Sequence, residues 1–213
     1  MQELAAGLWR WTARHTEWHP GRFGAEVASF AVEAEPTLLI DPLLPAHADG
    51  LLERLDALEP KAILITIPYH TRSAEDLSER YGATIHGHLA VKKRLGRTKR
   101  FRPIEGELPG GARAYPIGKP RRYETPIHLP SHRALAWGDA IVTTPEGDLR
   151  LWHMDRVDEK RIRWYRERFN PTLAPLLELD LERILVTHGE PILSYGSGAL
   201  QAAVDAEPWY NAG

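Results

Sequence analysis

Hydrophobic and polar positions change their period several times along the 213 residues. Alternation with a period of two predicts strands at 7–14, 26–34 and 37–42, and the short turns between them imply antiparallel neighbours. Leucines spaced on one helical face then predict a helix at 47–59, which is followed by an apolar strand at 62–67. The first third of the chain is therefore expected to contain strands, a helix and another strand.

The rest of the chain continues this mixed α/β pattern. We expect helices at 73–82, 88–95, 157–169, 172–179 and 197–205, and strands at 83–87, 112–117, 124–130, 134–142, 149–154 and 183–187. No segment has the composition of an interdomain linker, and no internal repeat is visible. The pattern indicates one domain over residues 1–213.

Composition narrows the possible chemistry. The formal charge of −2 and 43% hydrophobic residues are typical of a globular protein. The sequence has no cysteine, which excludes disulfides, thiolate metal sites and cysteine nucleophiles. No apolar run reaches the roughly 20 residues that span a bilayer, and charges interrupt the first fifteen residues. We therefore expect no membrane segment and a cytoplasmic protein.

Four short segments at strand ends carry a family resemblance: TLLIDP, ILITIPYHTRS, ALAWGDAIV and RILVTHGEP. Their order resembles that of the metallo-β-lactamase superfamily over roughly residues 8–200. The resemblance implies a four-layer αββα sandwich. It says less about function, because one fold can host many activities.

The metal-binding loop of that family differs here. Its T-H-x-H-x-D-H pattern aligns with Thr66, but the six residues that follow are IPYHTR. A one-residue slip would let His70 act as a ligand, whereas Arg72 places a permanent cation where a second metal's ligand would be. The segment YPIGKPR also lacks the family's next histidine. His132 is either a substitute ligand or a turn residue.

Two ligand positions of the family remain. Asp139 matches the metal-bridging aspartate and His188 the last ligand histidine, while Asp41 matches an aspartate that supports the loop. A retained zinc or other divalent metal would use Asp139, His188 and, after the one-residue slip, His70. We expect no cofactor, because a catalytic zinc needs three protein ligands and only Asp139 and His188 match ligand positions directly. The same groups could instead hold the loops together, or form a metal-free pocket for binding or acid–base chemistry.

These matches predict a site at one edge of the sandwich, formed by Tyr69, His70, Arg72, Asp139 and His188. We expect Arg72 to pair with Asp139 and to replace the charge of the lost metals. The predicted function is that of a divergent hydrolase-like protein of unknown substrate without the usual dinuclear metal site. The alternative is a non-catalytic ligand-binding or scaffolding protein that uses the emptied pocket.

One basic segment bears on the choice of partner. Residues 92–122 contain eleven lysines and arginines against two glutamates. We expect no nucleic-acid partner, because the segment lacks the interleaved aromatic residues expected for base stacking. A solvated cationic face that steers a small anionic ligand is the preferred interpretation. The oligomeric state is left open.

Overall fold

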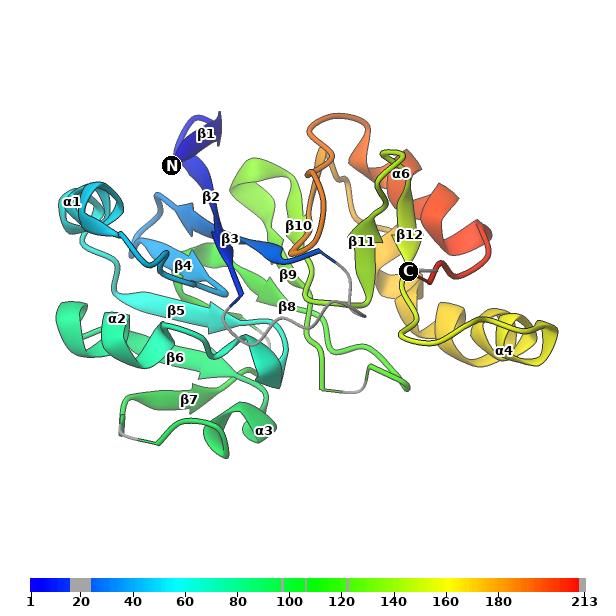
Figure 1. Ribbon diagram of the computed structural model, residues 1–213, viewed down its shortest axis with the longest axis horizontal. Coiled ribbons are helices and arrows are strands. Elements are labelled where there is room, and N and C mark those ends of the chain that lie inside the picture. The colour runs from blue at the N-terminus through cyan, green and yellow to red at the C-terminus, as the bar shows by residue number, and fades with distance from the viewer. Residues whose placement is uncertain (16–23, 97, 106, 122, 211–213) are drawn as a thin grey trace.

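The structure is a computed structural model that describes residues 1–15, 24–96, 98–105, 107–121 and 123–210. Two β-sheets face each other, and helices cover their outer sides (Figure 1). Helices α1 and α2 lie on the side of the N-terminal sheet, and α4 and α6 lie on the side of the C-terminal half.

The larger sheet has seven strands in chain order. Its first four strands run antiparallel to their neighbours, whereas β4 to β7 are parallel to one another. The strands are β1 (Gln2–Ala5), β2 (Leu8–Arg14), β3 (Glu26–Val32), β4 (Leu38–Ile40), β5 (Ala62–Ile65), β6 (Thr84–Gly87) and β7 (Phe101–Pro103). The sequence pattern did not predict the edge strands β1 and β7, which are short and partly exposed.

The smaller sheet has the order β13-β10-β9-β8, and β11 and β12 form a separate pair. The strands are β8 (Arg113–Ala114), β9 (Ile127–Leu129), β10 (Ala134–Ala136), β11 (Ile141–Thr143), β12 (Leu149–Leu151) and β13 (Arg183–Leu185). The prediction of one strand over 134–142 was wrong, because the chain breaks between β10 and β11. That break carries Asp139.

The helices are α1 (Asp49–Leu58), α2 (Ala74–Tyr81), α3 (Leu89–Lys92), α4 (Glu159–Trp164), α5 (Ala174–Leu177) and α6 (Gly196–Asp205). Short 3₁₀ turns are η1 (Pro68–His70), η2 (Pro109–Gly111), η3 (Pro130–His132) and η5 (Asn170–Leu173), and η4 (Tyr165–Phe169) is a π-helical turn. The basic helix predicted at 88–95 is thus a single turn. The helix predicted at 157–169 becomes π-helical after Trp164.

Three buried apolar clusters account for the layers. Phe30 and Leu64 of the large sheet pack with Ile127 and Ala136 of the small sheet, which forms the middle of the sandwich. The other face of the large sheet packs on Leu55 of α1 and Leu77 of α2. The other face of the small sheet packs on η4, α5 and α6. This arrangement confirms the predicted four-layer αββα sandwich.

The sandwich also positions the site. Parallel strands β4 and β5 end beside each other, as do the parallel strands β10 and β13. The loops that leave these four strands carry Asp41, His70, Asp139 and His188. Among the residues that the structure describes, no helix is long and apolar enough to cross a membrane.

Candidate functional site

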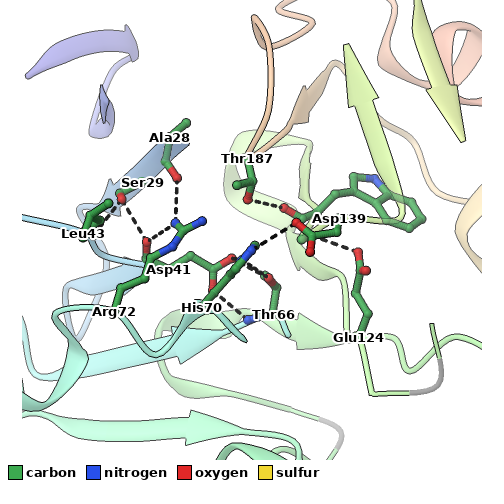
Figure 2. Close-up of polar contacts among 12 residues, drawn as sticks. Ala28, Ser29, Asp41, Leu43, Thr66, His70, Arg72, Glu124, Asp139 and Thr187 are labelled. Carbon is green, nitrogen blue, oxygen red and sulfur yellow. Dashed lines mark hydrogen bonds and ion pairs between the residues drawn. The ribbon is translucent and has the colours of Figure 1, made fainter. Parts of the chain in front are cut away.

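A polar cluster lies where these strands end (Figure 2). His70 is at its centre. Its Nδ1 atom lies 2.8 Å from Asp41 Oδ2, and its Nε2 atom lies 3.1 Å from Asp139 Oδ1. Because each ring nitrogen faces a carboxylate oxygen, the ring satisfies both partners only when both nitrogens carry hydrogen. The geometry therefore favours an imidazolium ion between the two aspartates.

The shift in the pKa of His70 also favours the imidazolium ion. Burial and the positive charge of Arg72 both act to lower this pKa, but the two aspartates outweigh them and the net shift is upward. For Asp139, burial alone would raise the pKa of the carboxyl. The neighbouring His70 and His188 instead hold it well below its usual range. An ionised Asp139 beside a protonated His70 is the consistent charge state.

Asp41 anchors the inner end of the cluster. Its Oδ1 atom accepts a hydrogen bond from the Thr66 N–H at 2.8 Å, and its Oδ2 atom accepts one from the Thr66 hydroxyl. The backbone carbonyl of Asp41 accepts a hydrogen bond from the Ser29 hydroxyl at 2.9 Å. Asp41 thus links the middle of β3 to the ends of β4 and β5, in agreement with the supporting role that the family resemblance implied.

The predicted pairing of Arg72 with Asp139 was wrong. Arg72 Nη1 donates to the backbone carbonyls of Asp41 at 3.0 Å and Ala28 at 3.4 Å, so its guanidinium group extends toward β3 (Figure 2). Within the described part of the chain, Arg72 forms no ion pair with a carboxylate. His70 occupies the place beside Asp139 that we expected Arg72 to take. Arg72 still contributes a positive charge to the cluster.

His188 forms the outer end of the cluster. Its Nε2 atom lies 3.5 Å from Asp139 Oδ1. The side chains of His188 and Asp139 are 13% and 16% exposed, whereas those of His70 and Asp41 are 5% and 2% exposed. The His188 and Asp139 end is therefore the less buried end of the cluster.

Comparison with known proteins places this geometry in a known fold. No family model and no curated relative matches the sequence. Among solved structures, a flavodiiron protein from Giardia intestinalis has a TM-score of 0.66 at 15% identity, and rubredoxin oxygen:oxidoreductase from Desulfovibrio gigas has 0.69 at 13%. These matches cover 96% and 95% of this chain, which spans 58% and 59% of the two proteins.

A metallo-β-lactamase from Pontibacter korlensis matches over both full lengths. The TM-score is 0.65 at 16% identity, and the match covers 97% of this chain and 98% of that one. The chain has the metallo-β-lactamase fold. At these identities the likeness establishes the fold alone, as the strand-end segments of the sequence predicted.

The metallo-β-lactamase fold raises the question of a metal. The donors at the expected positions are His70, Asp139 and His188, but both nitrogens of His70 already face aspartates. Among the described residues, no group of three or more histidines and carboxylates is arranged to hold a metal ion. Because a catalytic zinc needs three protein ligands and one open position, this donor arrangement does not fit it.

Glu124 is a member of the cluster that the sequence did not reveal. It is completely buried, and it accepts hydrogen bonds from the backbone N–H groups of Gly138 at 3.0 Å and Ala140 at 2.9 Å. Burial raises the pKa of Glu124 to about 7, although Arg121 lowers it. A carboxylate at the start of the predicted strand 124–130 was the available signal.

Two further predicted residues lie outside the cluster. Tyr69 is 63% exposed, and the guanidinium carbon of Arg94 lies 4.1 Å from its ring centre. Tyr69 therefore sits on the surface beside His70 and not among the buried polar groups. His132 lies in the turn η3, where its Nε2 atom contacts the Ala6 carbonyl at 3.2 Å. This placement agrees with the turn interpretation of His132.

Proposed function

We propose that this chain is a divergent, hydrolase-like protein that binds a small anionic molecule in a metal-free pocket at the Asp139 and His188 side of the cluster. One observation carries the proposal: the His70 ring lies between Asp41 and Asp139 with both nitrogens used. A buried cation in this position takes over the charge balance that a metal would otherwise supply. Two carboxylates without such a cation would be costly to bury.

The hydrolytic part of the proposal rests on His188 and Asp139. A histidine oriented by a carboxylate can accept a proton from water. Asp139 is in turn held by His70 and by the backbone turn that Glu124 fixes. The side chains of Asp139 and His188 are more exposed than those of Asp41 and His70, although the Asp139 Oδ1 and His188 Nδ1 atoms are themselves buried.

A second candidate is a non-catalytic ligand-binding or scaffolding protein. The burial of His70 and Asp41 favours it, because neither side chain is accessible to a reacting molecule. In this case Asp139 and His188 contact the ligand without moving a proton. Nucleic acid is not among the partners that we propose, and a cytoplasmic location stays a prediction.

The first experiment tests the absence of a catalytic metal. We expect protein purified without a metal-affinity tag to contain well under one zinc, iron or manganese per chain by elemental analysis. Its melting temperature should not change in a chelator, since ligand removal destabilises only a protein that binds the ligand in its folded state. A stoichiometric metal that survives dialysis, with a lower melting temperature after chelation, would contradict the proposal.

The second experiment separates the two candidates. Chelator-treated protein is assayed against p-nitrophenyl acetate and p-nitrophenyl phosphate, with His188→Gln as the test variant and His132→Gln as the matched control. We expect His188→Gln to lose at least about 100-fold in turnover, the lower range for general base catalysis, while His132→Gln keeps it. Absence of turnover in the wild-type protein would favour the non-catalytic candidate.

A further inference from the structure

Three aromatic rings beside the polar cluster each contact a cationic or imidazole side chain. The guanidinium carbon of Arg94 lies 4.1 Å from the ring centre of Tyr69, and that of Arg121 lies 5.0 Å from the ring of Trp152. The rings of His88 and Tyr123 are 5.0 Å apart. We call these six residues the rim.

Each ring of the rim is adjacent to the cluster. Tyr69 directly precedes His70, and Tyr123 directly precedes Glu124. The ring of Trp152 is 6.2 Å from that of His188. The Thr125 N–H also donates to the Thr66 carbonyl at 2.7 Å, so the segment that carries Tyr123 is fixed against the segment that leads to Tyr69.

Arg94 and Arg121 of the rim contact aromatic rings, whereas several other arginines of this protein form ion pairs. Arg80, Arg133 and Arg150 pair with carboxylates. Within the described part of the chain, neither Arg94 nor Arg121 has a carboxylate within ion-pair distance, and Arg121 donates to the carbonyl of Trp152. A guanidinium group that lies over a ring keeps its N–H edge available for a carboxylate or phosphate.

The rim also offers surface for a flat group. Tyr69 is 63% exposed and Tyr123 is 41% exposed, so each ring offers a face to solvent. Aromatic faces pack well against other flat rings. Two exposed tyrosine rings, and two guanidinium groups without a carboxylate partner in the described part of the chain, thus flank the cluster.

We propose that the rim recognises a small anion that carries a flat aromatic ring, with the ring against Tyr69 or Tyr123 and the anionic group on Arg94 or Arg121. This inference rests on the proposed function, because it names the chemical class of the ligand for the same pocket. It does not depend on whether the ligand is hydrolysed.

Two sets of matched probes test the ligand class. The first set is 2-naphthoate, the neutral naphthalene-2-carboxamide and the non-aromatic cyclohexanecarboxylate. The second set is adenosine 5′-monophosphate, adenosine and ribose 5-phosphate. Binding is measured by calorimetry and by ligand-observed NMR. We expect at least one probe with both features to bind about tenfold or more tightly than either of its single-feature analogues.

Variants locate the binding. Arg94→Gln, Arg121→Gln and Tyr69→Leu should each be tested, and at least one arginine variant and Tyr69→Leu should weaken binding about fivefold or more. Arg150→Gln is the control, since it removes a half-buried arginine that is paired with Asp148. Circular dichroism and melting temperature confirm that each variant is folded.

Three outcomes would overturn the inference. In the first, no probe that carries both an aromatic ring and an anionic group binds with a Kd below about 1 mM. In the other two, the neutral analogues bind as well as the anions, or the rim variants bind the probes as tightly as the wild-type protein does. The metal analysis and the His188→Gln assay remain independent of these results. Failure of the rim with a metal-free protein would therefore leave the proposed function standing.

Discussion

Asp41, His70, Asp139 and His188 form a line from the buried to the accessible side of the cluster. The two carboxylates carry two negative charges, and His70 and Arg72 carry two positive charges. Neither cation alone would balance both aspartates. Because His70 and Arg72 supply these countercharges, the two aspartates can stay buried without a metal, provided that their hydrogen bonds remain intact.

His70 is the member whose removal should cost most. His70→Ala would leave Asp41 and Asp139 without their shared partner, and breaking a buried ion pair typically costs about 3–5 kcal/mol. We expect a loss of that order in the free energy of unfolding, measured by urea denaturation at pH 7. His132→Ala is the control, because His132 makes its contacts at a partly exposed turn. A His70→Ala loss no larger than the control would mean that the line does not stabilise the fold.

The sequence identified the residues of this line but not how they are connected. Asp139 and His188 followed from the family resemblance, and His70 followed from a one-residue slip. Arg72 was assigned the wrong partner because its backbone takes a left-handed conformation with φ of 36°. This left-handed conformation directs the side chain toward the carbonyls of Asp41 and Ala28. A sequence pattern does not reveal such a conformation in an arginine.

At the scale of elements, the break between β10 and β11 decides where Asp139 points. The apolar run 134–142 has the pattern of one continuous strand, so sequence reasoning predicted no break. The structure provides a competing set of partners: Glu124 accepts hydrogen bonds from the N–H groups of Gly138 and Ala140. These bonds come from a residue distant in sequence, and a local pattern cannot encode them. The glycine was the one local indication.

Gly138 is required at this break for reasons of space. A Cβ atom there would lie 2.8 Å from the Thr66 hydroxyl oxygen and 3.1 Å from Ile67 Cγ2. Both neighbours belong to the buried segment after β5, so they have little room to move. We expect Gly138→Ala to destabilise the fold by about 1–3 kcal/mol through overpacking.

Two measurements check this prediction for Gly138→Ala. Urea denaturation gives the loss in stability, and the NMR signals of the His70 and His188 rings report whether the cluster is displaced. Gly147→Ala is an informative comparison, because a Cβ atom there meets nothing within 4 Å and only its positive φ of 93° is unfavourable. Unchanged stability and ring signals in Gly138→Ala would show that the packing at this break is looser than described.

At the scale of the whole molecule, the resemblance of four strand-end segments to the metallo-β-lactamase superfamily predicted the sandwich, and the periodicity of the chain predicted most of its elements. The inner faces of both sheets and the two outer helical layers follow the alternation and the helical spacing of the sequence. The edge strands β1 and β7 were missed because they are short and lack a buried face, which removes the alternation that marks a strand. Burial therefore explains both what was predicted and what was not.

The pH dependence of global stability combines several buried groups. The pKa of Glu124 is raised from 4.5 to about 7 and that of His70 is raised above 6.5, so both groups stabilise the fold at low pH. The stabilising contribution of Glu124 is lost as the pH rises from 4.5 through about 7. That of His70 is lost as the pH rises above 6.5. His86 and His128 act in the opposite direction, since burial lowers the pKa of each. The pKa of Asp139 is low, so its contribution is lost only at more acidic pH.

Glu124→Gln isolates one of these opposing contributions. The variant retains the shape of the side chain but has no carboxyl to titrate, and it loses part of the acceptor capacity for the Gly138 and Ala140 N–H groups. We expect it to be less stable than the wild-type protein at pH 5 by about 1–3 kcal/mol.

The wild-type protein should then lose about 3 kcal/mol relative to the variant between pH 4.5 and 7, because each pKa unit corresponds to about 1.4 kcal/mol. Urea denaturation of both proteins at half-unit steps of pH measures this difference. A difference that stays constant with pH would mean that the pKa of Glu124 is the same in the folded and unfolded states, so that its backbone hydrogen bonds offset its burial.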